Sequence, residues 1–200
     1  MTRRPRVALR GALWVAMAIA WPMTMIEPTR AVQFGKIFGR NDKMAWLPFK
    51  DAGGRFSLDY PAKDWRTMPT PGASLAILAH KDFEATLVVD YKRLEVPLEP
   101  ADVSPTFAEI ETEAIKERQS AAKDFKAEIV DTPAGRGALI RYSNAGQKGP
   151  DRVIQFSIPI RQDLYRLIGS IRQPLLAKHE ATIMHMIQSF VPGSTRSEND

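Results

Sequence analysis

The chain has 200 residues, 44% apolar and 26% charged, an ordinary balance for one folded domain with appendages. It has no cysteine, which excludes disulfides, thiolate zinc sites and cysteine nucleophiles. The formal charge is +5, but residues 1–31 carry five basic residues and one acid, so about +1 remains on the rest. So small a surplus argues against a nucleic-acid binder, because such domains usually carry a strong basic excess.

Residues 1–31 have the anatomy of a secretory signal peptide. A basic start precedes an apolar stretch at 12–26, and Thr29-Arg30-Ala31 resembles a small-x-small cleavage site. The apolar stretch is shorter than the ~20 residues of a membrane-spanning helix. We therefore expect cleavage near Ala31, a periplasmic or secreted protein, and no stable membrane span afterwards. A retained membrane anchor is the alternative.

In the next segment, 32–54, the apolar residues follow neither a helical nor a strand periodicity. We interpret it as a lead-in to a globular domain at 55–191. Alternating apolar residues predict strands at Phe56–Pro61, Ser74–His80 and Thr86–Leu94. Residues 62–72, which contain prolines, predict a loop or a short helical turn.

A helix is predicted from Ser104-Pro105, an N-cap followed by proline at the first helical position. Its predicted inward stripe consists of Phe107, Ile110, Ala114, Ala121 and Phe125. Acidic residues come early in this helix and basic residues late, the order that suits the helix dipole.

The centre of the domain is predicted to be three successive strands, at Arg136–Ser143, Arg152–Ile160 and Leu164–Arg172, after a short strand at Lys126–Thr132. In the middle strand Phe156 and Ile158 alternate with Gln155 and Ser157, which predicts one buried face and one polar face. Only Arg161-Gln162-Asp163 separates the last two strands, so they should be antiparallel neighbours.

Residues 143–151 predict a loop, 175–190 a final helix, and 192–200 a disordered tail. Met184 and Met186 in the final helix are interpreted as core filling. The predicted fold class is α+β: a single domain with an antiparallel sheet flanked by helices.

The opening strand FSLDYP, followed by Trp65, resembles the "F-x-(I/L)-x-(Y/V)-P…W" of the PsbP-like/DcrB-like group of small exported domains. Tyr165-Arg166-Leu167 and Ser189-Phe190 are similar to that family's late Y-x-L strand and to the end of its closing helix. The resemblance covers about residues 55–190. It implies an α/β/α sandwich and no enzymatic activity.

The sequence contains no recognisable catalytic constellation. Nucleophilic catalysis needs a base beside an activated hydroxyl, and only His80, His179 and His185 offer an imidazole. No serine lies in a G-x-S-x-G elbow, and the glycines lack the spacing of phosphate-binding loops. We predict no enzyme, no catalytic residues and no cofactor.

Two pairs of potential metal ligands stand far apart, His80 with Asp82 and His179 with Glu180. A metal site needs three or four converging ligands, and such distant pairs do not show convergence. We therefore expect no metal, with His80 at the end of an edge strand and His179 partly packed at a helix boundary.

The polar side of the predicted sheet carries Asp90, Arg141 and Arg166, together with Gln155 and Ser157. One interpretation is a face open to solvent, as antiparallel sheets allow. The other is a flat surface whose arginines recognise a carboxylate or an acidic partner, with Asp90, Arg141 and Arg166 as binding residues. If helices cover both faces, Asp90 should pair with one of the two arginines.

The function predicted on these grounds is an exported, non-catalytic domain that binds a protein or another component of the cell envelope. The alternative is a periplasmic protein that binds a small ligand or a metal through His80 and Asp82 or through Arg141 and Arg166.

Overall fold

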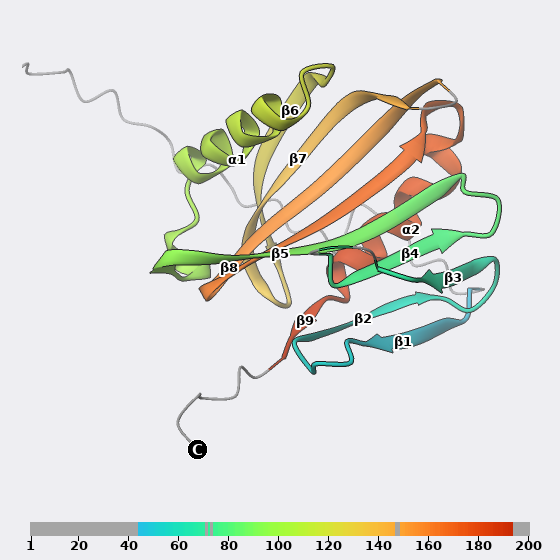
Figure 1. Cartoon of the computed structure of the whole chain (residues 1–200), viewed down its shortest axis with the longest axis horizontal. Helices are drawn as coiled ribbons and strands as arrows, with labels where there is room; N and C mark the ends of the chain where they lie inside the picture. The colour runs from blue at the N-terminus through green and yellow to red at the C-terminus, as the bar shows by residue number, and fades with distance from the viewer. Residues whose placement is uncertain (1–43, 71, 73, 147–148, 194–200) are drawn as a thin grey trace, which may run out of the picture. The chain divides into compact units, whose positions relative to one another are not determined.

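A computed structural model describes residues 44–70, 72, 74–146 and 149–193, and Figure 1 shows how their helices and strands are arranged. The elements are β1 (Trp46–Lys50), β2 (Phe56–Pro61), β3 (Trp65–Met68), β4 (Ala76–His80), β5 (Ala85–Leu98), η2 (Pro100–Asp102), α1 (Pro105–Arg118), β6 (Lys123–Thr132), β7 (Gly135–Gly146), β8 (Gly149–Arg172), η3 (Gln173–Leu175), α2 (Leu176–Gln188) and β9 (Val191–Pro192). They form two antiparallel sheets, ordered β1-β2-β9 and β3-β4-β5-β8-β7-β6. The predicted α+β class is confirmed, whereas the predicted signal peptide and residues 194–200 of the predicted tail lie outside the described residues.

β8 lies at the centre of the larger sheet and folds back on itself near Arg161. Its first part pairs with β7 and its last part with β5. Ser157 and Arg166 both bond Glu111 Oε2, at 2.8 and 2.7 Å. A straight strand would set these two residues about 30 Å apart, so the chain must reverse between them. Arg161 has a left-handed backbone (φ 58°) at the reversal. The chain therefore reverses direction at this short link, as the sequence predicted.

α2 covers one face of the larger sheet. Phe156 is fully buried in the core on this side, together with Ile183 and Ile187 of α2, as the alternation predicted. Ile183 comes so close to Gly169 of β8 that no Cβ would fit there. The smaller sheet packs against α2 as well, since Trp46 of β1 stacks on a histidine of the helix.

α1 covers the opposite face, so the predicted open polar face is wrong. Gln155 and Ser157 are 1% and 0% exposed, and Arg166 is 6% exposed. The predicted stripe of α1 is also wrong: the helix turns Glu111 and Ile115 inward and leaves Ile110 61% exposed. This face of the helix packs on the sheet because it carries a carboxylate that pairs with a buried arginine. A prediction from hydrophobicity alone places such a charged face toward solvent.

Several segments predicted to be irregular contain strands. β1 lies in the predicted lead-in, β3 in the predicted loop at 62–72, and β7 and β8 extend into the predicted loop at 143–151. Short strands at a sheet margin form through backbone hydrogen bonds, which require no alternation of side chains. β4 is not an edge strand, because β3 pairs with it and sets Trp65 opposite His80.

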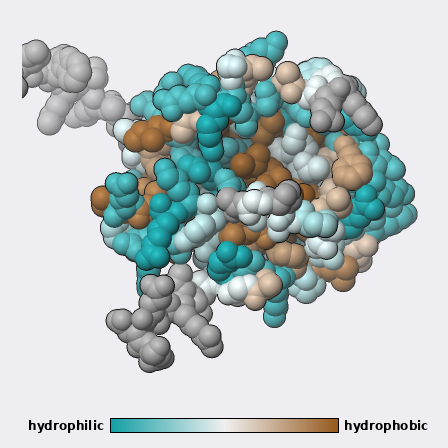
Figure 2. All heavy atoms as spheres, in the orientation of Figure 1, coloured by the Kyte–Doolittle hydropathy of each residue, from teal (hydrophilic) through white to brown (hydrophobic). Residues whose placement is uncertain are grey.

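Among the residues that the structure describes, no helix is both long and apolar enough to span a membrane. Figure 2 shows one face of the molecule, where hydrophilic side chains surround smaller apolar areas. Within the described ranges, the exposed large apolar side chains are spread over four elements and the turn after β4: Leu47, Phe83, Val96, Ile110 and Val191.

Candidate functional site

Three side chains from separate elements meet beside the start of α2, and we call His80, Glu84 and His179 the His–Glu–His cluster. β4 ends at His80, and the turn after it is closed by a hydrogen bond from Phe83 N to His80 O, 2.8 Å. Phe83 adopts the left-handed region at φ 52°, unusual for a bulky residue. This reversal brings Glu84 back beside His80.

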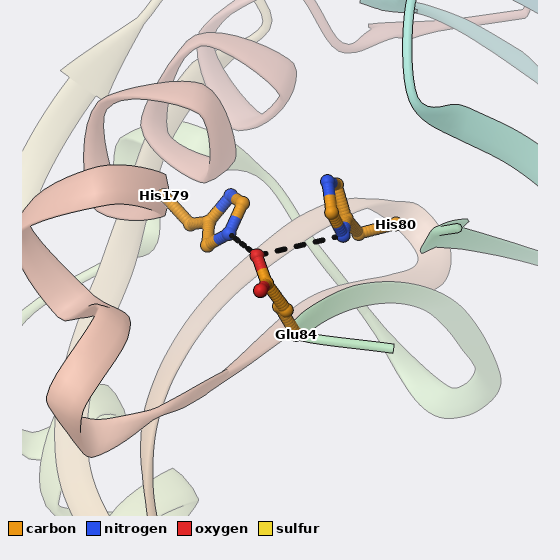
Figure 3. Close-up of side chains that lie close together, drawn as sticks. All are labelled: His80, Glu84 and His179. Carbon is orange, nitrogen blue, oxygen red and sulfur yellow. Dashed lines mark hydrogen bonds and ion pairs between the residues drawn. The ribbon is translucent and has the colours of Figure 1, made fainter. Parts of the chain in front are cut away.

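The two imidazoles face the same carboxylate oxygen (Figure 3). His179, in the first turn of α2, places Nε2 2.9 Å from Glu84 Oε2. His80 Nδ1 lies 3.7 Å from that oxygen. The centroids of the two rings are 4.9 Å apart, and both histidines are only 4% exposed. Trp65 of β3 packs its ring against both imidazoles, with centroid distances of 6.1 and 6.4 Å.

Cations from the helix and from β8 surround this carboxylate. Lys178 Nζ lies 2.5 Å from Glu84 Oε2, and Arg172 Nη2 lies 3.8 Å from Oε1. The hydrogen bonds from Lys178 and then from His179 lower the pKa of Glu84 to about 2, so it is ionised at neutral pH. Burial, and then the neighbouring His179, lower the pKa of His80, which favours its uncharged form.

A second polar cluster lies on the other face of the sheet, beneath α1; we call it the Glu111–Arg166 cluster. Arg166 donates two hydrogen bonds to Glu111, at 2.7 and 2.8 Å. Ser157 donates a third at 2.8 Å, and Gln155 lies 3.4 Å from the same carboxylate. Burial acts to raise the pKa of Glu111, but the bonds and charge of Arg166 outweigh it and the pKa is lowered. The cluster is closed: its carboxylate oxygens already accept these donors.

No protein-family model and no curated protein matches the chain. Solved structures do match it. The solution structure of cyanobacterial PsbP (CyanoP) from Synechocystis sp. PCC 6803 aligns over 77% of this chain and 96% of its own, with a TM-score of 0.55 and 13% identity. The chain has a PsbP-like fold. The resemblance of FSLDYP and Trp65 to that group is thereby confirmed at the level of the fold.

Two further structures share this PsbP-like fold. LpqN of Mycobacterium tuberculosis, a protein involved in cell envelope biogenesis, aligns over 76% of this chain and 92% of its own, with a TM-score of 0.52 and 11% identity. A protein from Bacteroides thetaiotaomicron VPI-5482 aligns over 76% of this chain but 49% of its own, with a TM-score of 0.50 and 12% identity. At such identities the likeness concerns the fold alone, so the chemistry of the site must come from this chain's own residues.

The PsbP-like fold separates the three residues predicted to bind a ligand. Asp90 and Arg166 face each other in register on the α1 side of the sheet. Arg141 lies on the α2 side, where it pairs with Glu128 and lies 3.8 Å from Glu180. Arg166 bonds Glu111 rather than Asp90. These residues form no single surface, and their role in binding stays a prediction.

The two histidines considered as metal ligands do converge, but with a different acid from those considered. Asp82 donates its backbone N–H to His80 Nδ1 at 3.4 Å, and Glu180 turns toward Arg141. Glu84 was missed, because its only sequence signal is a spacing of four from His80 across a turn. His179 lies about a hundred positions further on, and only the packing of α2 brings it near.

Proposed function

We propose that this protein is an exported, non-catalytic domain that binds a protein or another component of the cell envelope. The observation that carries the proposal is the PsbP-like fold, shared with LpqN over 92% of that chain, since LpqN is involved in cell envelope biogenesis. The signal-like residues 1–31 support the same location.

The contacts of the ionisable groups support binding rather than catalysis. A hydroxyl nucleophile needs an imidazole or another base as its hydrogen-bond partner. His80 and His179 face a carboxylate and an indole ring, and the buried hydroxyl of Ser157 donates to Glu111. Glu111 is itself held in an ion pair with Arg166.

Export is tested by producing the full chain in a bacterial host and measuring its location and intact mass. We expect the protein outside the cytoplasm with a mass that lacks Met1–Ala31. A chain that begins at Val32 is the control and should stay inside. Cytoplasmic protein of full-length mass would contradict the proposal.

Binding is tested by size-exclusion chromatography of the protein released from cell envelopes under mild conditions. We expect it to elute with a partner, well ahead of the same protein purified alone. Identical elution of the two samples would mean that no stable envelope partner exists.

A second candidate function, the binding of a metal ion, is favoured by one specific observation, the His–Glu–His cluster.

A further inference from the structure

We propose that His80, Glu84 and His179 form a binding site for one divalent transition-metal ion of the zinc type, where β4, the following turn and α2 meet (Figure 3). The proposal goes beyond the envelope-binding role and does not depend on it.

The ligand atoms are already close to the spacing that a metal ion needs. Bonds of about 2.0–2.2 Å in a tetrahedral site set the ligand atoms roughly 3.3–3.6 Å apart. In the cluster the carboxylate oxygen lies 2.9 Å from one imidazole nitrogen and 3.7 Å from the other. All three ligand atoms lie within 4.8 Å of one another. Small side-chain rotations are enough to close this set around an ion.

The backbone that holds these ligands is well anchored. His80 is paired in the ladder opposite Trp65, and the Glu84 carbonyl accepts a hydrogen bond from Arg172 N at 3.1 Å. His179 is fixed by the first turn of α2. Trp65 packs against both imidazole rings and limits their rotation. A preformed set of ligands loses little conformational freedom when it binds an ion.

A cation already contacts one of the three proposed ligand atoms. Lys178 Nζ contacts Glu84 Oε2, the oxygen on which both imidazoles converge. The Lys178 side chain is 56% exposed, so its ammonium is free to move into water and to leave that oxygen to a metal ion. Arg172 remains near Oε1 and its positive charge weakens the site. We therefore expect binding of moderate strength that Lys178 opposes.

The ligand types select the class of metal. Two imidazole nitrogens and one carboxylate oxygen suit zinc, cobalt, nickel and copper, whereas magnesium and calcium prefer oxygen ligands throughout. Glu84 is 17% exposed, so the site lies at the edge of the interior. The Asp82 N–H near His80 Nδ1 is a long contact of 3.4 Å that a metal ion would replace.

The test uses the untagged full chain, because a histidine tag would itself bind metal. Equilibrium dialysis should show one zinc or cobalt ion per chain at micromolar metal, and no stoichiometric binding of magnesium or calcium. His80→Gln, Glu84→Gln and His179→Gln should each weaken binding by about tenfold or more. Changing a residue that only supports a metal ligand already costs about this much, and the loss of a ligand itself should cost no less. Bound cobalt should give the visible absorption of a four-coordinate site.

Two further variants separate a metal site from a merely structural cluster. His185→Gln is the matched control, because His185 lies on the same helix but stacks on Trp46; its zinc affinity should equal that of the wild type. Lys178→Ala should bind zinc several-fold more tightly, because the competing ammonium is gone. Far- and near-ultraviolet circular dichroism confirms that each variant is folded. A folded wild type without bound metal, affinities unchanged in His80→Gln and His179→Gln, or loss of binding in His185→Gln would each overturn the proposal.

Discussion

The two polar clusters lie on opposite faces of one sheet and differ in how their carboxylates are satisfied. Glu111 accepts two hydrogen bonds from the Arg166 guanidinium and one from the Ser157 hydroxyl, and its side chain is 5% exposed. Glu84 receives two imidazoles and a lysine that is more than half exposed. The strongest donors of the first cluster are fixed by burial, whereas one donor of the second is free to leave.

This difference distinguishes a structural ion pair from an exchangeable one. A buried arginine that bonds both oxygens of a carboxylate cannot move away without leaving an unpaired charge in the interior. An ammonium at the surface leaves at little cost, because water replaces its bonds. We therefore assign the Glu111–Arg166 cluster to the attachment of α1 and the His–Glu–His cluster to ion binding.

The largest expected effect is that of Glu111→Gln, which leaves the Arg166 charge buried without its counter-ion. Breaking a buried pair in this way lowers the free energy of unfolding by about 3–5 kcal/mol, a large part of a typical 5–15 kcal/mol. The control is Glu113→Gln on the same helix, which removes an exposed pair with Lys116 and should cost about 0–1 kcal/mol. Urea melts measure both, and equal losses would show that the buried pair has no special role.

The orientation of α1 is tested by two isoleucines on opposite sides of the helix. Ile115 is 1% exposed and Ile110 is 61% exposed. Ile115→Ala should lower the unfolding free energy by about 2–5 kcal/mol, and Ile110→Ala by no more than about 0.5 kcal/mol. If urea melts showed the larger loss for Ile110→Ala, the opposite face of α1 would be the buried one, and Glu111 would not lie in the interior.

Ser157→Ala removes one donor from the buried Glu111 carboxylate. Leaving a buried acceptor short of a hydrogen bond costs about 1–3 kcal/mol. Ser170→Ala, in the same strand, breaks only a long contact of 3.3 Å to Asp151 and should cost about 0.5 kcal/mol or less. If thermal or urea melts show a negligible loss for Ser157→Ala, the hydroxyl is not part of the closed cluster.

The pH dependence of stability should also separate wild type from Glu111→Gln. The pKa of Glu111 is lower in the folded chain than its ordinary value of 4.5, because Arg166 outweighs the effect of burial. Its stabilisation is therefore complete above the unfolded pKa and is lost as pH falls through the folded pKa below 4.5. Between neutral and acid pH, the urea midpoint should fall more for wild type than for the variant. Equal slopes would contradict the lowered pKa.

The sequence predicted the parts of the fold that alternation and turn length determine. Phe156 is buried where its alternating strand places it, and β8 turns at Arg161 where the short link requires it. The sequence could not predict the covered α1 face. Gln155 and Ser157 produce the same polar pattern whether water or Glu111 satisfies them, so the pattern alone favoured an open face.

The candidate site could be predicted only in its parts. The histidines were recognised as possible ligands, but nothing local relates His80 to His179, which the packing of α2 beside β4 brings together. Glu84 depends on the left-handed turn at Phe83, a conformation that the residue type disfavours and that a sequence pattern therefore does not indicate. Convergence of distant ligands is a property of the tertiary structure.

The most direct test of the difference between the two clusters is the zinc-dependent shift in melting temperature, measured side by side in wild type, Glu84→Gln and Glu111→Gln. Zinc at a hundred times its dissociation constant stabilises a folded protein by about 2.7 kcal/mol, which raises the melting temperature by several degrees. We expect Glu111→Gln to melt at a lower temperature but to keep this shift, and Glu84→Gln to lose it. A shift that persists in Glu84→Gln, or that disappears in folded Glu111→Gln, would contradict the account.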